Sequence, residues 1–147
     1  MSDRIFTLDE AQNLVPVLES LLRTAMTGKK AIQEIETELQ EARRRVFLMG
    51  GMQLNVIGLT RRKAEQEKAL QSLKDSLYEL GSAGVQVKDL EMGLLDFPCM
   101  VEDRMILLCW KLGEPRIAHW HGTDEGFAGR KSLSDIISNL QNPPRPQ

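Results

Sequence analysis

The residues best suited to do chemistry gather in one stretch, residues 108 to 132, which reads LCWKLGEPRIAHWHGTDEGFAGRKS. This stretch contains both histidines, both tryptophans and one of the two cysteines of the chain. Histidine exchanges protons near neutral pH and binds metal ions, while carboxylates and guanidinium groups pair with each other or hold charged ligands. The sequence therefore directs the search for a binding or catalytic site to this stretch.

His119 and His121 are separated by one residue, so on a strand both rings project from the same face. Such a pair can share a metal ion, but a site needs at least a third ligand. The candidates are Glu114, Asp124, Glu125 and Cys99, the last of which the predicted strand register puts in the same cross-strand row as His121. Strand histidines are more often ordinary hydrogen-bonded residues at a sheet margin. We therefore assign no metal ligands from the sequence.

The loop at residues 126 to 132, GFAGRKS, has the residue types of a phosphate-binding loop but not their order. A Walker loop needs Gly-Lys-Ser in succession, whereas Arg130 separates Gly129 from Lys131. A nucleic-acid-binding Gly-x-x-Gly loop lies between two helices on a basic surface, and here a predicted strand and two acidic residues precede it. Serine and cysteine nucleophile motifs are also missing, because no serine lies in a Gly-x-Ser-x-Gly turn and neither cysteine has a charged neighbour.

A polar cluster at turns and strand ends remains, and two interpretations of it stay open. The first is a structural ion pair that pins the loop over 122 to 130, and the second is a group that grips a ligand. We predict that Arg130 meets a carboxylate, with Glu114 or Asp96 as first choice and Asp124 next, and that any ligand is an anion bound beside it. The candidate ligand-binding residues are Asp96, Glu114, Trp120, His121, Asp124, Glu125 and Arg130.

The two cysteines lie among apolar residues, where a free cysteine behaves as a small hydrophobic side chain. We interpret Cys99 and Cys109 as structural thiols, and we expect Leu108, Cys109 and Trp110 in the core.

A long helical hairpin is predicted over about 8 to 81. Thr7 and Glu10 have the spacing of a capping box at the start of the first helix. Pro16 predicts either a kink or a first helix that stops near Leu14. Apolar residues then recur in alternating three- and four-residue steps in both arms, which is the seam of a coiled-coil-like pair.

Turn residues in GGMQLN, residues 50 to 55, make the two arms antiparallel. Folding the seam about this loop places Leu39 near Gln66, Ile32 near Leu73 and Gly28 near Leu77. The first arm is about 50 Å long at the usual rise of 1.5 Å per residue. The far end of such a long hairpin has no other part of the chain to pack against, which favours an oligomer interface.

Four segments rich in strand-favouring residues predict an antiparallel meander over about 85 to 121. A two-residue turn at Glu102 and Asp103 puts the odd-numbered residues from Leu95 to Cys99 on one face with the even-numbered ones from Ile106 to Trp110. Both faces are largely apolar, so each needs a cover. The hairpin covers one, and the N-terminal helix or another subunit covers the second.

The predicted fold class is α+β: a long antiparallel helical hairpin packed with a small antiparallel β-meander. Residues 1 to 142 form a single domain, which ends with a loop and a short C-terminal helix over 122 to 141, capped by Ser134. A proline-rich tail over 143 to 147 is expected to be disordered.

The formal net charge of −2 gives no general attraction to nucleic acid or anionic membrane. The sequence shows no signal-peptide pattern and no run of apolar residues long enough to span a bilayer. We expect a cytoplasmic protein that binds no membrane.

Several motifs together resemble the prokaryotic family called domain of unknown function 2203: FTLDEA near the start, then GVQVKDLEMGLLDFP, LCWKLGE, WH and GFAGR. The resemblance covers Arg4 to about Leu133 and implies no activity. It maps the family's motif positions onto Asp89, Gly93, Asp96, Phe97, Cys109, Trp110, Gly113, Glu114, Trp120, His121, Gly126 and Arg130. His119 is outside these positions, which weakens the paired-histidine metal site further.

These observations predict a homo-oligomeric interaction module or a module that binds a small anion. The alternative is an enzyme acting on a small anionic substrate, with Glu114 or His121 as acid or base and Arg130 as the anion clamp, with or without a metal ion. The sequence identifies no cofactor.

Overall fold

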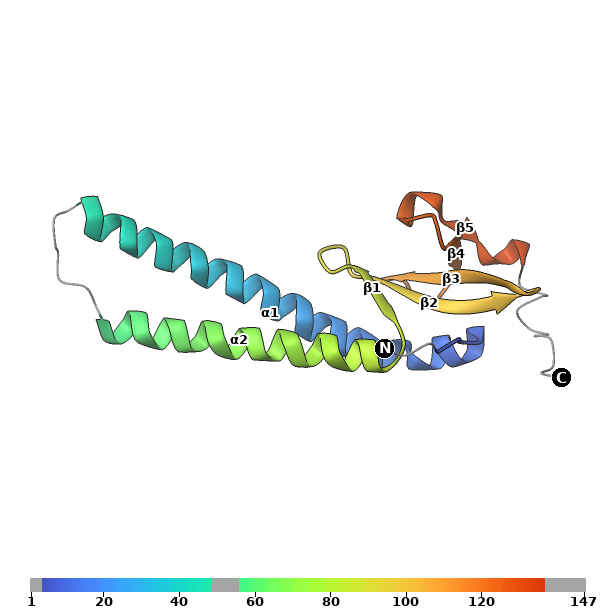
Figure 1. Cartoon of the computed structure of the whole chain (residues 1–147), viewed down its shortest axis with the longest axis horizontal. Helices are drawn as coiled ribbons and strands as arrows, with labels where there is room; N and C mark the ends of the chain where they lie inside the picture. Colours follow the sequence, from blue (N-terminus) through green and yellow to red (C-terminus); the bar gives the residue numbers. More distant parts are fainter. Residues whose placement is uncertain (1–3, 49–55, 137–147) are drawn as a thin grey trace.

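The computed structural model describes residues 4 to 48 and 56 to 136, which form two helices and one five-stranded antiparallel sheet (Figure 1). The predicted α+β fold with a helical hairpin and a meander is confirmed, with five strands where four were predicted. Two 3-10 turns, Phe127–Gly129 and Leu133–Asp135, flank the last strand. The elements are α1 (Leu8–Leu48), α2 (Val56–Ser82), β1 (Gln86–Asp89), β2 (Leu94–Val101), β3 (Arg104–Lys111), β4 (His119–Gly122) and β5 (Lys131–Ser132).

Helix α1 begins at the predicted capping box. The backbone N–H of Thr7 donates to Glu10 Oε1 at 3.0 Å, and the N–H of Glu10 donates to Thr7 Oγ1 at 3.1 Å. The helix continues through Pro16 as one element, so the alternative in which a first helix stops near Leu14 is wrong. A proline removes one helical hydrogen bond, but buried residues on both sides of Pro16 pack into the core and hold the helix together.

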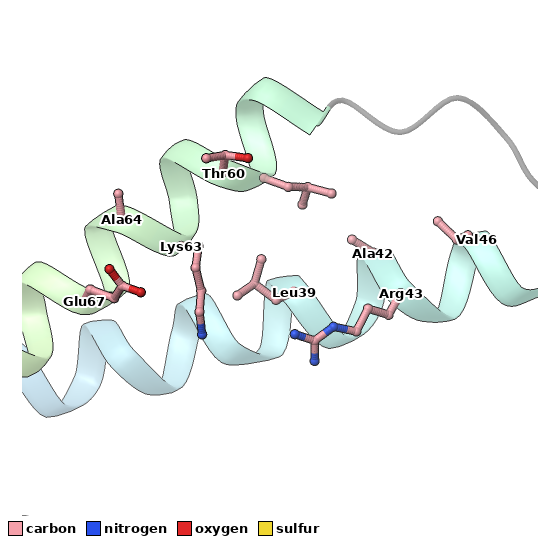
Figure 2. A pocket seen from close by; sticks show the side chains of 9 residues that line it. Leu39, Ala42, Arg43, Val46, Thr60, Lys63, Ala64 and Glu67 are labelled. Atoms are coloured by element: carbon pink, nitrogen blue, oxygen red, sulfur yellow. The ribbon is translucent and has the colours of Figure 1, made fainter.

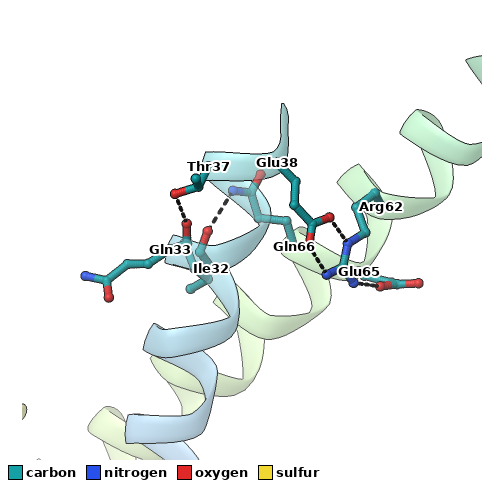
Figure 3. A network of polar contacts seen from close by, with 7 residues as sticks. All are labelled: Ile32, Gln33, Thr37, Glu38, Arg62, Glu65 and Gln66. Atoms are coloured by element: carbon teal, nitrogen blue, oxygen red, sulfur yellow. Dashed lines mark hydrogen bonds and ion pairs between the residues drawn. The ribbon is translucent and has the colours of Figure 1, made fainter. Parts of the chain in front are cut away.

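The two helices pair about one turn out of the predicted register. Gln66, predicted opposite Leu39, instead donates its amide to the backbone carbonyl of Ile32 at 3.2 Å (Figure 3). The same view shows the guanidinium of Arg62 held between the carboxylates of Glu38 and Glu65. These polar pairs lock a register that an apolar seam alone does not specify.

Gly28 is the point of closest approach between the helices. A Cβ atom built there lies 3.0 Å from the carbonyl oxygen of Ala69 and 3.4 Å from Cβ of Leu73. The predicted neighbour was Leu77, one turn further along α2. A glycine lets two helix backbones approach closely. The fit of Gly28 against Ala69 and Leu73 is therefore a stronger indication of the helix register than the length of the connecting loop. Residues 49 to 55 of that loop lie outside the described residues.

Strands β2 and β3 form the predicted hairpin, with Phe97 opposite Leu108. Glu102 and Asp103 have φ angles of 49° and 63°, the left-handed values that a tight two-residue hairpin turn requires. One face of this hairpin packs on the N-terminal half of α1, with the Phe6 ring edge-on to Phe97 at 5.4 Å. The sheet residues of this core are Leu95, Phe97, Cys99, Val101, Ile106, Leu108 and Trp110.

The opposite face of β2 and β3 is buried by the chain itself. In Figure 1, β4, β5 and the segment that follows them stand away from the helices across β2 and β3. Five residues of this second face are at most 4% exposed: Leu94, Asp96, Leu107, Cys109 and His121. The N-terminal part of α1 packs on the other face, and the chain itself covers these five residues as it continues through β4, the loop and β5, while Pro98, Met100 and Met105 of the same face stay partly exposed.

Two further predictions about the C-terminal part need correction. His121 lies opposite Leu107, whereas Cys99 pairs with Ile106 and faces the helices, so Cys99 and His121 do not share a row. The cap predicted at Ser134 is instead Ser132, whose hydroxyl accepts from the Ser134 N–H at the start of a 3-10 turn. The rest of the predicted short helix and the tail fall beyond residue 136, outside the described residues. Neither α1 nor α2 is apolar enough over a sufficient length to cross a membrane.

Candidate functional site

Three residues with metal-binding or acid-base side chains meet on the second face of the sheet. Asp96 on β2 lies directly opposite Cys109 on β3, and His121 on β4 lies beside them. Their relative exposures are 0%, 1% and 1%. The sulfur, a ring nitrogen and a carboxylate oxygen all lie within 4.8 Å of one another. We call Asp96, Cys109 and His121 the buried trio.

The hydrogen bonds of His121 fix its tautomer. Nδ1 lies 2.8 Å from the carbonyl oxygen of Gly122, which only accepts, so Nδ1 carries a proton and donates it. Nε2 lies 3.0 Å from Asp96 Oδ2, yet neither oxygen of Asp96 has an aligned hydrogen bond. A ring without a proton on Nε2 would turn a lone pair toward a carboxylate oxygen. Since two acceptors repel at this distance, a positively charged species, a proton or a metal cation, has to lie between them.

Burial decides the chemistry of the two thiols. It raises the pKa of Cys109 to about 12, and the neighbouring Asp96 carboxylate acts in the same direction. Burial also raises the pKa of Cys99 to about 11. Both thiols therefore keep their protons at neutral pH unless a cation displaces them, which does not suit a free nucleophile.

The predicted contact of Arg130 with a carboxylate is confirmed. Arg130 Nη2 donates to Glu114 Oε1 at 2.6 Å and to the carbonyl of Cys109 at 3.3 Å. The same Glu114 oxygen accepts from the Lys111 N–H, and Glu114 Oε2 lies 3.4 Å from His119 Nδ1. Arg130 thus ties the loop after β4 to the end of β3, next to the buried trio.

Of the other predicted site residues, Asp124 and Glu125 lie on the loop after β4, and Trp120 lies on β4 itself. Glu125 Oε1 accepts from the Gly122 N–H and from Lys131 Nζ at 2.7 Å, and these bonds, led by Lys131, lower the pKa of Glu125. Lys131 also lies over the Trp120 ring at 4.6 Å. Asp124 is exposed and makes no hydrogen bond or ion pair within the described part of the chain.

The structure therefore divides the predicted site residues into separate groups. Asp96 and His121 belong to the buried trio, and Glu114 and Arg130 form an ion pair beside it. Trp120 on β4 packs against the core, whereas Asp124 and Glu125 lie on the loop. The site role of Cys109 was missed, although strand alternation already placed Cys109 and Asp96 on one face. An aspartate at the centre of an apolar strand was the signal that could have found it.

A second feature lies at the far end of the hairpin, where Figure 1 shows α1 and α2 diverging. A cavity of about 620 Å³ opens between them (Figure 2). Four large apolar side chains near it are 65% to 86% exposed: Phe47, Leu48, Val56 and Ile57. Lys63 is exposed and lines the cavity. The cavity is lined by Leu39, Ala42, Arg43, Val46, Leu59, Thr60, Lys63, Ala64 and Glu67.

Comparison with protein-family models matches residues 4 to 133 to an uncharacterised conserved protein family, DUF2203. Neither the search of curated proteins nor the search of solved structures gives a match. The match spans α1, α2, the five strands, the buried trio and the Glu114–Arg130 ion pair. The chain therefore belongs to the uncharacterised conserved family DUF2203.

Proposed function

We propose that the protein is a homo-oligomeric interaction module that self-associates through the far end of its helical hairpin. We call residues 34 to 48 of α1 and 56 to 67 of α2 the distal hairpin. The observation that carries the proposal is the exposure of Phe47 (86%), Leu48 (66%), Val56 (65%) and Ile57 (74%) beside the cavity. Large apolar side chains clustered around a recess are typical of protein–protein contact surfaces.

The charges of the distal hairpin favour a second copy of the same chain as the partner. Residues 34 to 41 of α1 contain four glutamates and no basic residue, and residues 43 to 45 are three arginines. In an isologous two-fold pairing, the acidic part of each copy lies beside the basic part of the other. Glu34, Arg44 and Arg61 make no ion pair within the described chain, so their charges are available to a partner.

The shape of the distal hairpin supports the same conclusion. Its cavity is lined by apolar side chains, including Leu39, Val46 and Leu59, and by the charged side chains of Arg43, Lys63 and Glu67. An apolar centre with a charged rim is the usual composition of a stable interface. The exposed side chains of a second hairpin, led by Phe47 and Ile57, match this recess in chemistry.

Sedimentation velocity at micromolar concentration tests the proposal. We expect the wild-type chain to sediment as a dimer or larger assembly, and Ile57→Glu to shift it toward the monomer. Ile57 is exposed, so the substitution leaves the fold of the single chain intact. Tyr78→Glu is the matched control, because Tyr78 is 77% exposed on the same helix but outside the distal hairpin. A wild-type monomer, or equal dissociation of both variants, contradicts the proposal.

A small-anion site beside Arg130 is the second candidate. Arg130 Nε and His119 Nδ1 are buried without hydrogen-bond partners, and both side chains contact Glu114. An anion that accepts from them is compatible with this arrangement. An enzyme acting on such an anion needs an accessible acid or base, which favours Glu114 over His121 because His121 is 1% exposed.

Isothermal titration calorimetry with inorganic phosphate tests the anion site. Arg130→Lys keeps the charge but loses the planar geometry of the guanidinium. We expect this variant to bind phosphate at least tenfold more weakly than wild type, while Arg116→Lys, an exposed control, binds unchanged. The absence of phosphate binding by wild type, or an equal loss in both variants, rules out this candidate.

A further inference from the structure

The buried trio contains more polar groups than its place in the sheet requires. Neighbouring residues on the same face are apolar, such as Leu94 and Leu107, both 4% exposed. Asp96 is fully buried, and neither of its oxygens has an aligned hydrogen bond. A carboxylate that is removed from water without a compensating positive charge strongly destabilises a fold. The Asp96 carboxylate therefore requires a compensating positive charge, which is either a proton or a metal ion.

The orientation of His121 identifies where that positive charge lies. Its Nδ1–H donates to the backbone carbonyl of Gly122, which leaves the Nε2 lone pair facing Asp96. Histidines that bind metals commonly donate the second ring N–H to a carbonyl or carboxylate, because this fixes both tautomer and ring orientation. The bond to Gly122 thus prepares Nε2 as a ligand atom.

We propose that Asp96, Cys109 and His121 bind one divalent transition-metal ion, with Zn²⁺ as the best match. A set of one sulfur, one nitrogen and one oxygen suits zinc and related ions, whereas Ca²⁺ and Mg²⁺ prefer oxygen ligands alone. Ligand atoms around a tetrahedral zinc lie about 3.5 Å apart. The separations in the trio run from 3.0 Å to within 4.8 Å, so small side-chain movements would bring three of the four ligands of a tetrahedral zinc into place.

The position of the trio gives the ion a structural role. Its ligands come from three neighbouring strands, β2, β3 and β4, and each is at most 1% exposed. Binding replaces the proton of the Cys109 thiol, which passes to solvent, and leaves a thiolate bound to the metal. Arg130 and Glu114 lie near Cys109, and Glu125 lies near His121, so the surroundings carry both signs of charge. The ion cross-links the sheet independently of any contact between copies.

A shared proton is the competing explanation for the same geometry. In that case an imidazolium of His121 pairs with the Asp96 carboxylate, and Cys109 is a packed thiol that takes no part. The two explanations make different predictions for the sulfur of Cys109: a metal ion forms a bond to it, whereas a proton shared between His121 and Asp96 does not. A measurement that detects a metal–sulfur bond therefore separates them.

The experiment uses the untagged full chain, since an affinity tag of histidines binds metals itself. We expect elemental analysis of protein purified without chelators to find about one zinc per chain. After replacement of zinc by Co²⁺, we expect the near-ultraviolet charge-transfer band of a cobalt–thiolate bond. Cys109→Ser should abolish this band and weaken Co²⁺ binding at least tenfold. Cys99→Ser, the matched control, should keep both, because Cys99 is equally buried but on the other face of the sheet.

The wild-type spectrum decides the question even where a variant fails to fold. A folded wild-type chain that carries no metal and gives no thiolate band with Co²⁺ overturns the proposal in favour of the shared proton. A band that survives in Cys109→Ser, or that is lost equally in Cys99→Ser, overturns the assignment of Cys109 as the sulfur ligand. Asp96→Asn provides a second test, with weaker Co²⁺ binding and a retained band expected.

Discussion

At the residue scale, the stretch from 108 to 132 separates into core and site according to strand alternation. Leu108 and Trp110 face the helices, whereas Cys109 lies on the other face of the sheet with Asp96 and His121. Alternation predicted the two faces from the sequence alone, but Cys109 was assigned to the core together with Leu108 and Trp110. It did not predict the partners of each side chain, because His121 is placed by the pairing of β4 with β3, and the sequence between those strands, residues 112 to 118, fixes no register.

Trp110 is the largest side chain of the core, and it is fully buried. Its indole Nε1–H donates to the carbonyl of Glu114 at 3.1 Å, so the ring also fixes the turn that carries the partner of Arg130. We expect Trp110→Ala to lower the free energy of unfolding by about 3 to 5 kcal/mol. Urea denaturation measures this change. As control, Tyr78→Ala should change stability by less than about 0.5 kcal/mol, because Tyr78 is exposed. Similar losses in the two variants are incompatible with this core.

At the element scale, the local signals of the sequence were reliable and the long-range ones were not. The capping box of α1 and the turn at Glu102 and Asp103 depend on residues close in sequence, and both are confirmed. The pairing of the helices depends on contacts such as that of Gln66 with Ile32. A heptad pattern permits several registers one turn apart, so the sequence predicted the hairpin but not its alignment.

Gly28 provides the test of this alignment. A side chain there meets the Ala69 carbonyl at 3.0 Å, so Gly28→Leu should push the helices apart and lower stability by about 1 to 3 kcal/mol. Gly81→Ala is the control: no atom lies within 4 Å of the new Cβ, and the gain in helix propensity should stabilise by up to about 1 kcal/mol. Thermal unfolding of both variants measures the difference. A Gly28→Leu variant as stable as wild type would mean that α1 and α2 do not approach each other there.

At the scale of the whole molecule, the two ends differ in the burial of their apolar residues: most are buried at the sheet end, whereas several are exposed at the far end of the hairpin. The helix-facing side of β2 and β3 and part of their second face are buried within one chain, which weakens one of the two arguments for an oligomer. The other argument, a helical rod that extends beyond its own core, remains and is sharpened by the exposed Phe47 and Ile57. We propose that a metal ion at the buried trio stabilises the sheet end, and that the distal hairpin provides the contact with a second copy. A stable contact of this kind buries more than about 1,000 Å² in total.

The most direct test of self-association through the distal hairpin is the distance between spin labels on two copies of the chain. Arg61→Cys places a label in the distal hairpin, and Tyr78→Cys places one roughly 25 Å away along α2 at a rise of about 1.5 Å per residue. Both positions are exposed, and the native Cys99 and Cys109 are too buried to take a label. Pulsed electron paramagnetic resonance should give a clearly shorter distance between copies for residue 61 than for residue 78. The absence of any distance between copies, or a shorter one for residue 78, would contradict the account.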